Sequence, residues 1–291
     1  MRLPKFEYFA PKTLEAALCL LAEKGEGARV LAGGTDLLIK MKQDLLRPKV
    51  IIGLKGIDGL DKIDFQVKKG LTIGATALLA EVASHPDILK RYPAVAYAAQ
   101  ETANVQIRNM GTVGGNLCNA APSADNAPTL IAMKAEVILA GLKGERRLPL
   151  DQFFIGPGIT ALEPGEIMTS IFVPLPSPKT GTSYQHISAR GKVDISAVCV
   201  GVMATFEGET CRQALIVLGS VAPTPLRAKK AEGLVQGQKW TMELIEKAGD
   251  QAAEESKPIS DVRASSEYRQ EMVAVLTRRA LREAHKRAKK R

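Results

Sequence analysis

The fold of this chain is decided by two glycine-centred segments, Leu31-Ala32-Gly33-Gly34-Thr35-Asp36 and Gly111-Thr112-Val113-Gly114-Gly115-Asn116. Each segment presents consecutive backbone N–H groups, and its glycines have no Cβ that would block a close approach. Such concavities suit phosphate oxygens, because oriented amides carry partial positive charge. Two of them, each ending in a small polar residue, predict one ligand whose diphosphate is held from both sides.

Neither segment matches the motif of another class of phosphate site. The chain has no G-x-x-x-x-G-K-[ST] sequence, which excludes a P-loop NTPase, and no G-x-G-x-x-G after its first strand, which argues against a Rossmann site. Asp, His and Ser are not arranged as in a hydrolase elbow. What remains is a diphosphate clamp without a nucleophile of its own. A flavin domain needs such a clamp, because the cofactor carries the redox chemistry.

The composition is that of an ordinary globular protein with one large domain or two. The chain has 291 residues, of which 45% are hydrophobic and 24% charged. Its apolar runs are shorter than the ~18–20 residues of a membrane span, and its first residues lack the apolar stretch of a signal peptide. We therefore expect a cytoplasmic protein without a membrane span.

The cysteines and histidines predict no metal site and no catalytic triad. A zinc site or an iron–sulfur cluster needs closely spaced thiolates, whereas the residues of both types are scattered through this chain. They are Cys19, Cys118, Cys199 and Cys211, and His85, His186 and His285.

Most of the net charge of +9 lies at the end of the chain. Residues 278–291 contain eight basic residues and a single acid, Glu283, which together contribute +7. The simplest interpretation is a solvated helix end, with docking to an acidic partner subunit as the alternative. Nucleic acid is not expected, because only 4% of the residues are aromatic and the tail has no aromatics interleaved.

Hydrophobic periodicity predicts an α+β chain whose first part contains two subdomains, over residues 1–58 and 59–176. Thr13 is expected to cap a helix that ends at Gly25. The further elements expected in the first subdomain are strands over 29–32 and 49–54 and a short helix over 37–41. In the second we expect hairpins over 64–75 and 135–150, helices over 78–83 and 94–103, a buried segment over 129–133 and a strand over 166–173.

The proline- and serine-rich stretch 174–181 predicts a domain boundary. Beyond it we expect an α+β domain over 180–291 with an antiparallel sheet. Its expected strands cover 183–188, 197–206 and 212–219, and its expected helices cover 229–234, 242–255 and 267–287.

The motifs of the chain resemble those of the FAD-binding medium subunit of the molybdenum hydroxylases, the group that includes xanthine, carbon monoxide and nicotinate dehydrogenases. The resemblance is carried by residues 32–36, by 106–117 extended through Pro122-Ser123-Ala124-Asp125, and by Val221-Ala222-Pro223-Thr224-Pro225-Leu226-Arg227-Ala228. It implies a two-subdomain FAD-binding domain of the vanillyl-alcohol-oxidase/PCMH type, followed by an α+β C-terminal domain.

The resemblance also implies which residues bind FAD. The amides of Ala32 to Thr35 would hold one side of the pyrophosphate, and the segment from Thr112 to Asn116 would hold the other side and the ribityl chain. Asp125 is expected at the ring end, with a simple helix N-cap as the alternative. The complete set of expected contacts is Leu31, Ala32, Gly33, Gly34, Thr35, Asp36, Ile107, Thr112, Gly114, Gly115, Asn116, Ala121, Asp125, Met168 and Tyr184.

Met168, Tyr184 and Gln185 occupy positions that the resemblance places near the isoalloxazine ring. The resemblance implies that Met168 lies against the ring and that Tyr184 is the aromatic residue common after the linker. Core packing is the alternative for both side chains. Gln185 occupies a position where xanthine dehydrogenases carry lysine, so no charged group is implied there.

The resemblance further implies an oxidoreductase subunit without catalytic residues of its own. A molybdopterin-binding large subunit would hydroxylate the substrate and select it. A small [2Fe–2S] subunit would relay electrons to the FAD of this chain, which would pass them to an external acceptor such as NAD or a quinone. The usual assembly of the family is a dimer of heterotrimers.

Two alternatives remain at this point. The first is a stand-alone flavin reductase of the UDP-N-acetylenolpyruvoylglucosamine reductase type, which would share the glycine segments. Residues 122–125 and 221–228 argue against it. The second is a non-catalytic binding module whose basic tail meets nucleic acid, which would bind no chromophore.

Overall fold

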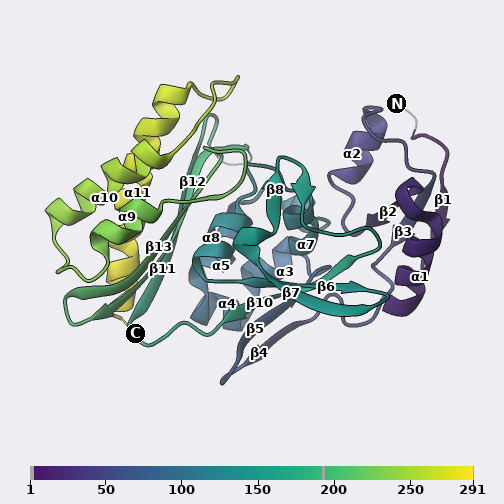
Figure 1. The fold of residues 1–291 in the computed structure, drawn as a ribbon, viewed down its shortest axis with the longest axis horizontal. Coiled ribbons are helices and arrows are strands. Elements are labelled where there is room, and N and C mark those ends of the chain that lie inside the picture. The colour runs from purple at the N-terminus through teal and green to yellow at the C-terminus, as the bar shows by residue number, and fades with distance from the viewer. Residues whose placement is uncertain (1–2, 192–193, 291) are drawn as a thin grey trace.

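The computed structural model describes residues 3–191 and 194–290 and sets three sheets side by side along its longest axis (Figure 1). The N-terminal sheet is parallel and has the order β1-β3-β2. Thr13 caps its first helix as expected, since the Thr13 hydroxyl accepts from the amide of Ala16. The elements of this subdomain are β1 (Glu7–Phe9), α1 (Leu14–Lys24), η1 (Gly25–Gly27), β2 (Ala28–Leu31), α2 (Leu37–Lys42) and β3 (Val50–Gly53).

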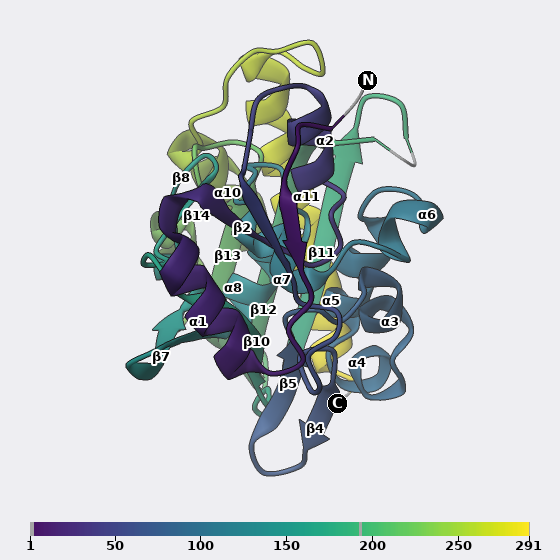
Figure 2. The same cartoon turned by 90° about the vertical axis from the view of Figure 1, so that its right-hand side faces the viewer.

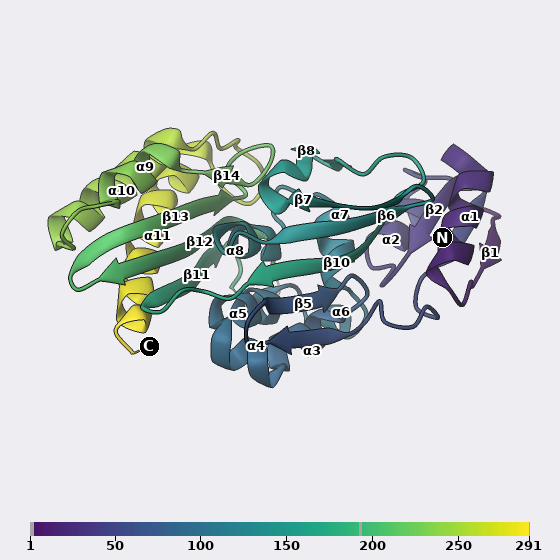
Figure 3. The ribbon, with the colours of Figure 1, turned by 60° about the horizontal axis from the view of Figure 1, so that its bottom comes forward.

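The second sheet is antiparallel and has the order β4-β5-β10-β6-β7. Its strands are β4 (Ile63–Gln66), β5 (Gly70–Gly74), β6 (Glu136–Gly141), β7 (Gly144–Pro149) and β10 (Ile167–Pro174). Helices pack on one face of it, as Figure 3 shows from below. They are α3 (Leu79–Ser84), α4 (Pro86–Arg91), α5 (Pro93–Glu101) and α8 (Asn126–Ala132), with the short α6 (Val105–Arg108) and α7 (Val113–Cys118) nearby. The connection from β7 to β10 holds η2 (Leu150–Gln152), β8 (Phe154–Gly156) and β9 (Ile159–Thr160).

The third sheet is antiparallel and has the order β11-β12-β13-β14. Its elements are β11 (Thr180–Ser188), β12 (Ser196–Glu207), β13 (Thr210–Gly219), β14 (Leu226–Arg227), α9 (Lys229–Val235), α10 (Met242–Glu255) and α11 (Ser266–Ala288). The three helices cover the outer face of this sheet, and α8 lies against its inner face (Figure 1).

Both faces of the third sheet are therefore buried. Val202 and Ile216 point outward into the core shared with α9, α10 and α11. Met203, Leu215 and Val217 point inward and belong to the core of the second sheet and its helices. One apolar core thus crosses from the second sheet, through α8, to the third.

The predicted α+β class is confirmed, with local differences. The segment 113–118, expected to be a turn, is the helix α7, and the buried segment around 129–133 is the end of α8. β1 has only three residues, two of them exposed, so it has no alternating pattern that the sequence could display. The helix α4 begins at Pro86 directly after α3 ends, and was not expected.

The basic tail is described up to Lys290, and Arg291 lies outside the described residues. Its described part includes the last turns of α11, and several of its basic residues pair with acids of the same domain. Arg282 bonds to Glu246, Arg287 to Glu283, and Lys289 to Glu209. This pairing favours the interpretation as a helix end over a nucleic-acid surface. Among the described residues, no helix is both long enough and apolar enough to traverse a bilayer.

Candidate cofactor-binding site

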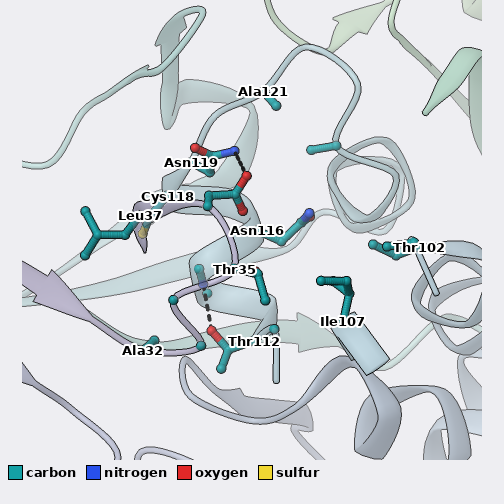
Figure 4. Close-up of a pocket in the computed structure, with 18 of the residues that line it drawn as sticks. Ala32, Thr35, Leu37, Thr102, Ile107, Thr112, Asn116, Cys118, Asn119 and Ala121 are labelled. Carbon is teal, nitrogen blue, oxygen red and sulfur yellow. Dashed lines mark hydrogen bonds between the residues drawn. The ribbon is translucent and has the colours of Figure 1, made fainter. Parts of the chain in front are cut away.

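A cavity of about 1120 Å³ lies between the subdomains and reaches the C-terminal domain. It is lined by the first glycine segment, by α7 and the residues after it, by the start of β10, and by the loops around 190 and 263. Figure 4 shows Thr35 and Thr112 near one another in this cavity. Small-molecule pockets usually measure about 300–1,000 Å³, so the cavity accommodates a ligand as large as a dinucleotide.

The first glycine segment contributes unpaired amides. It leaves β2 at Leu31 and enters α2 at Leu37, and Gly34 adopts a φ of 77° that permits the sharp turn. None of the N–H groups from Gly33 to Asp36 donates a hydrogen bond within the described part of the chain. Four successive donors that face a cavity suit the oxygens of a diphosphate. The role of these amides in holding a diphosphate stays a prediction.

The second glycine segment differs from the prediction, because its amides are already engaged. Thr112 caps α7 by accepting from the amide of Gly115 at 3.0 Å. The amide of Gly114 donates to the carbonyl of Ala75, and that of Asn116 donates to the carbonyl of Thr112. The bonds of Gly115 and Asn116 arise because the segment begins a helix, whereas the bond of Gly114 ties it to the residue after β5. Because the Cβ positions of Gly114 and Gly115 face Ala75 and Thr112, what the segment offers a ligand is the side chain of Asn116.

The amide group of Asn116 is oriented by a neighbour. Asn126 donates from its Nδ2 both to Asn116 Oδ1, at 3.1 Å, and to the hydroxyl of Thr102, at 3.1 Å. Since the oxygen of Asn116 is occupied, its Nδ2 is left to donate into the cavity, which Asn116 lines. Asn116 thus adds a side-chain donor opposite the first segment.

Asp125 forms the wall of the cavity on the side of the C-terminal domain. It is buried, and its Oδ1 accepts two hydrogen bonds of 2.6 Å, from Tyr184 Oη and Ser196 Oγ. Burial raises the pKa of Asp125, although the two hydroxyl bonds oppose that shift. Asp125 occupies the N-cap position of α8, but its side chain makes no capping bond to that helix.

Tyr184 does not line the cavity and acts through Asp125. Its side chain is 1% exposed and stacks on the ring of His186, with 5.7 Å between the ring centroids. Its hydroxyl ends on the carboxylate of Asp125, so the predicted link between Tyr184 and the cofactor would be an indirect one. Gln185 also lies outside the cavity lining, and its amide donates to the hydroxyl of Ser183 at 3.4 Å.

Met168 and Asp125 both line the cavity. Met168 lies on β10 and packs in the core of the second sheet and its helices, whereas Asp125 contacts strands of the C-terminal domain. The other predicted residues all line the cavity: Leu31, Ala32, Gly33, Gly34, Thr35, Asp36, Ile107, Thr112, Gly114, Gly115, Asn116 and Ala121.

Sequence reasoning missed several charged residues of the lining, namely Lys40, Arg190 and Arg263, because they belong to no motif. Asp36 accepts from Asn119 Nδ2 at 3.0 Å, and Lys40 donates to Asn119 Oδ1 at 2.7 Å, so this trio joins the two subdomains. Lys40 follows Asp36 by one helical turn, which is the signal that could have suggested it. Arg190 and Arg263 come from loops of the C-terminal domain, and no local pattern in the sequence indicates them.

The fold and the cavity define a domain of two subdomains that could hold a nucleotide cofactor, joined to a second α+β domain. Comparisons with known proteins show which family the chain belongs to. Residues 4–176 match the family model described as the FAD binding domain in molybdopterin dehydrogenase, and residues 183–284 match the CO dehydrogenase flavoprotein C-terminal domain. The chain belongs to the family of FAD-binding medium subunits of molybdenum hydroxylases.

Relatives of this family match nearly the whole chain. The carbon monoxide dehydrogenase medium chain of Hydrogenophaga pseudoflava is 34% identical over 278 residues, which cover 96% of each chain. The xanthine dehydrogenase FAD-binding subunit of Escherichia coli O157:H7 is 30% identical and covers 95% of each. In a solved structure of the Hydrogenophaga pseudoflava enzyme, a chain that is 35% identical superposes with a TM-score of 0.95 over 99% of each chain.

The cofactor of the chain is FAD, and the residues present fit it. The unpaired amides after β2 suit a diphosphate, and the side chain of Asn116 adds a donor. Groups of three or more metal-ligating side chains are not found in the part of the chain that is described. When bound, FAD supplies the redox chemistry, while the protein binds it and sets its surroundings.

Proposed function

We propose that this chain takes electrons from the [2Fe–2S] clusters of a small subunit and passes them, through FAD, to an external acceptor such as NAD or a quinone. The observation that carries the proposal is the cavity, which holds four unpaired amides at its middle and a buried carboxylate at one end. Its described lining provides binding groups, and burial raises the pKa of the one thiol among them, Cys118, to about 12, which disfavours the nucleophilic thiolate. An electron-transfer subunit needs only such groups, because the cofactor performs the chemistry.

The placement of FAD in the cavity follows from its donors. We place the diphosphate between the amides of Gly33 to Asp36 and the side chain of Asn116. We place the isoalloxazine beside Asp125, whose carboxylate can accept from a ribityl hydroxyl or a ring N–H. We expect Met168, which lines the cavity from β10, to contact the bound cofactor.

The proposed assembly is a dimer of heterotrimers in the cytoplasm, with a molybdopterin-binding large subunit and a [2Fe–2S] small subunit. The names of the relatives support a multi-subunit enzyme, since they are a medium chain and an FAD-binding subunit. Apolar side chains exposed at the rim of the cavity also support it. Val262 is 99% exposed and Ile195 is 45% exposed, and both line the cavity mouth. A partner subunit would cover them.

The test is an absorption spectrum of the purified chain, followed by heat release of any ligand and its chromatography. We expect flavin bands and FAD in the supernatant. A tagged copy should then be purified from its native cells under anaerobic conditions. Three polypeptides with molybdenum and iron are expected, and reduction of NAD⁺ or of a quinone analogue would identify the acceptor. Recovery of the tagged chain alone would contradict the proposed assembly.

The alternative of a stand-alone flavin reductase lacks support. The likeness to the UDP-N-acetylenolpyruvylglucosamine reductase of Thermus caldophilus covers 58% of this chain with a TM-score of 0.37, which carries no argument. Both halves of the chain match the molybdenum hydroxylase flavoproteins instead.

A further inference from the structure

We propose that Glu101, His186, Ser196 and Asp125 form a chain that carries protons from the molecular surface to the ring end of the cavity. The proposal rests on the proposed function, because it takes the isoalloxazine to lie beside Asp125. Electrons that arrive singly from iron–sulfur clusters bring no protons, whereas complete reduction of a flavin takes up at least one. A flavin ring enclosed between domains therefore needs a route for them.

The four side chains are in continuous hydrogen-bond contact. Ser196 Oγ lies 2.6 Å from Asp125 Oδ1 and 3.3 Å from His186 Nδ1, and His186 Nε2 lies 3.3 Å from Glu101 Oε2. They come from four elements of the fold. Asp125 precedes α8, and Glu101 ends α5. Ser196 begins β12, and His186 lies on the neighbouring strand β11.

The chemistry of the donors fixes the direction of these bonds. An ionised Asp125 can only accept hydrogen bonds, so the hydroxyl of Ser196 must donate its single hydrogen to that carboxylate. His186 Nδ1 must then donate to Ser196 Oγ. If Nε2 also donates to Glu101, His186 carries protons on both nitrogens, and its charge lies between two carboxylates.

One proton can move along this chain without breaking any contact. His186 Nδ1 gives its proton to Ser196 Oγ while Ser196 gives its own proton to Asp125 Oδ1. Asp125 is then neutral and donates to Ser196, Ser196 donates to the free lone pair of Nδ1, and His186 is neutral with Nε2 still donating to Glu101. Every polar atom is paired before and after, which is the condition for a low-cost transfer in a buried network.

The two ends of the chain lie in the required places. Asp125 lines the cavity, whereas the side chains of His186 and Glu101 are 16% and 15% exposed, so solvent can replace the proton. Other titratable groups near the imidazole include Tyr184 stacked on it, Tyr97 beside Tyr184, and Cys199, which faces His186 across the β11–β12 pair. The burial that raises the pKa of Asp125 also favours its protonated form.

The structure offers a matched pair of variants. Tyr184 and Ser196 both donate to Asp125 Oδ1 at 2.6 Å. Of the two hydroxyls, that of Ser196 is also within hydrogen-bond distance of His186 Nδ1, whereas Tyr184 only stacks on the ring. Ser196→Ala and His186→Gln interrupt the chain. Tyr184→Phe removes an equal hydrogen bond without interrupting it, and Ser196→Thr keeps the hydroxyl.

The experiment follows proton uptake, not turnover, in the FAD-loaded chain. Reduced methyl viologen, whose oxidation releases no proton, reduces the bound FAD anaerobically in weakly buffered solution with a pH indicator. We expect Ser196→Ala and His186→Gln to slow proton uptake by about tenfold or more. Ser196→Thr should restore the rate, and Tyr184→Phe should slow uptake less than Ser196→Ala does, because it weakens a bond to Asp125 without interrupting the chain.

Two results would overturn the proposal. Unchanged uptake in Ser196→Ala and His186→Gln would exclude the route. Equal slowing of proton uptake in Tyr184→Phe and Ser196→Ala would show that the two hydroxyls only adjust the pKa of Asp125 and carry no proton. The FAD spectrum of each variant separates these outcomes from a failure of the proposed function. A colourless wild-type chain that binds no added FAD would refute both, whereas a yellow chain with unaltered uptake refutes only the proton route.

Discussion

Gly33 lies directly against the backbone of Met110, so the two glycine segments touch as well as facing a common cavity. A Cβ on Gly33 would overlap the carbonyl group of Met110 and would come within 2.8 Å of the Cα of Gly111. Figure 2 shows the N-terminal subdomain in front of the second one in this region. The contact joins main chain to main chain, so no side-chain rotation can relieve an added atom.

The first prediction follows from that contact. Gly33→Ala should force the two subdomains apart, reduce FAD content and destabilise the chain by about 1–3 kcal/mol. Urea unfolding and the FAD-to-protein ratio measure both effects. Gly233→Ala is the control, because no atom lies within 4 Å of its added Cβ and the residue lies inside α9. That variant should be neutral or more stable by up to about 1 kcal/mol. Equal FAD loss in both would contradict the argument.

The second prediction concerns the donor opposite the free amides. Asn116→Asp removes the Nδ2 donor and adds a negative charge, while Asn126 can still donate to the remaining oxygen. We expect FAD to bind about 10- to 100-fold more weakly, which corresponds to about 1.4–2.8 kcal/mol. Titration of the apoprotein with FAD measures this. Asn109→Asp makes the same chemical change on an exposed residue whose side chain bonds only to Val105, and should leave the affinity unchanged.

The third prediction concerns the pH dependence of apoprotein stability. The pKa of Asp125 is raised in the folded chain, so folding binds a proton that the unfolded chain releases. Stability should therefore fall as the pH rises from the unfolded pKa toward the folded one. Asp125→Asn keeps an acceptor for Tyr184 and Ser196, and it removes the loss of stability that accompanies the ionisation of Asp125. We expect the variant to be more stable than the wild type at neutral pH, and the difference to vanish in acid.

Asp261 provides the control of opposite sign. The backbone amide of Arg263, with the Arg269 and Arg263 side chains, lowers the pKa of Asp261 to about 2. Its contribution to stability is present above the unfolded pKa and is lost as the pH falls toward 2. Asp261→Asn should therefore destabilise the chain at neutral pH. Urea unfolding of both variants between pH 4 and pH 8 tests the pair, and shifts of the same sign would refute the assignment.

The fourth prediction concerns thiol reactivity. Cys118 lines the cavity, but its sulfur is buried and burial raises its pKa to about 12. Cys19 is exposed on α1. Because the thiolate is the reactive form, iodoacetamide at neutral pH should modify Cys19 at least about 100-fold faster than Cys118. Peptide mass spectrometry measures the two rates. Comparable rates would show that Cys118 is open to solvent.

Much of the first glycine segment could be predicted from the sequence, because its function resides in the backbone. Gly33 and Gly34 mark a turn in any context, and the amides there remain free in the fold. The second segment looked the same but is helical, since Thr112 accepts from Gly115 and closes the first turn. A glycine pair inside such a cap cannot be distinguished locally from one in a loop.

The neighbours of Asp125 could not be predicted from the sequence at all. Tyr184 and Ser196 reach it from strands 59 and 71 residues further along the chain. Such contacts depend on how β11 and β12 pack on α8, which no local pattern encodes. Arg190 and Arg263 are missing from the prediction for the same reason, since each lies on a loop brought to the cavity by the C-terminal domain.

The shared core has a consequence for how such chains can be divided. The inner face of the third sheet, with Met203, Leu215 and Val217, has no cover except the helices of the preceding domain. Cutting the chain between Pro174 and Thr180 would expose that face on one fragment and α8 on the other. We therefore expect the two halves that match separate family models to unfold together, so that neither half alone would keep its fold.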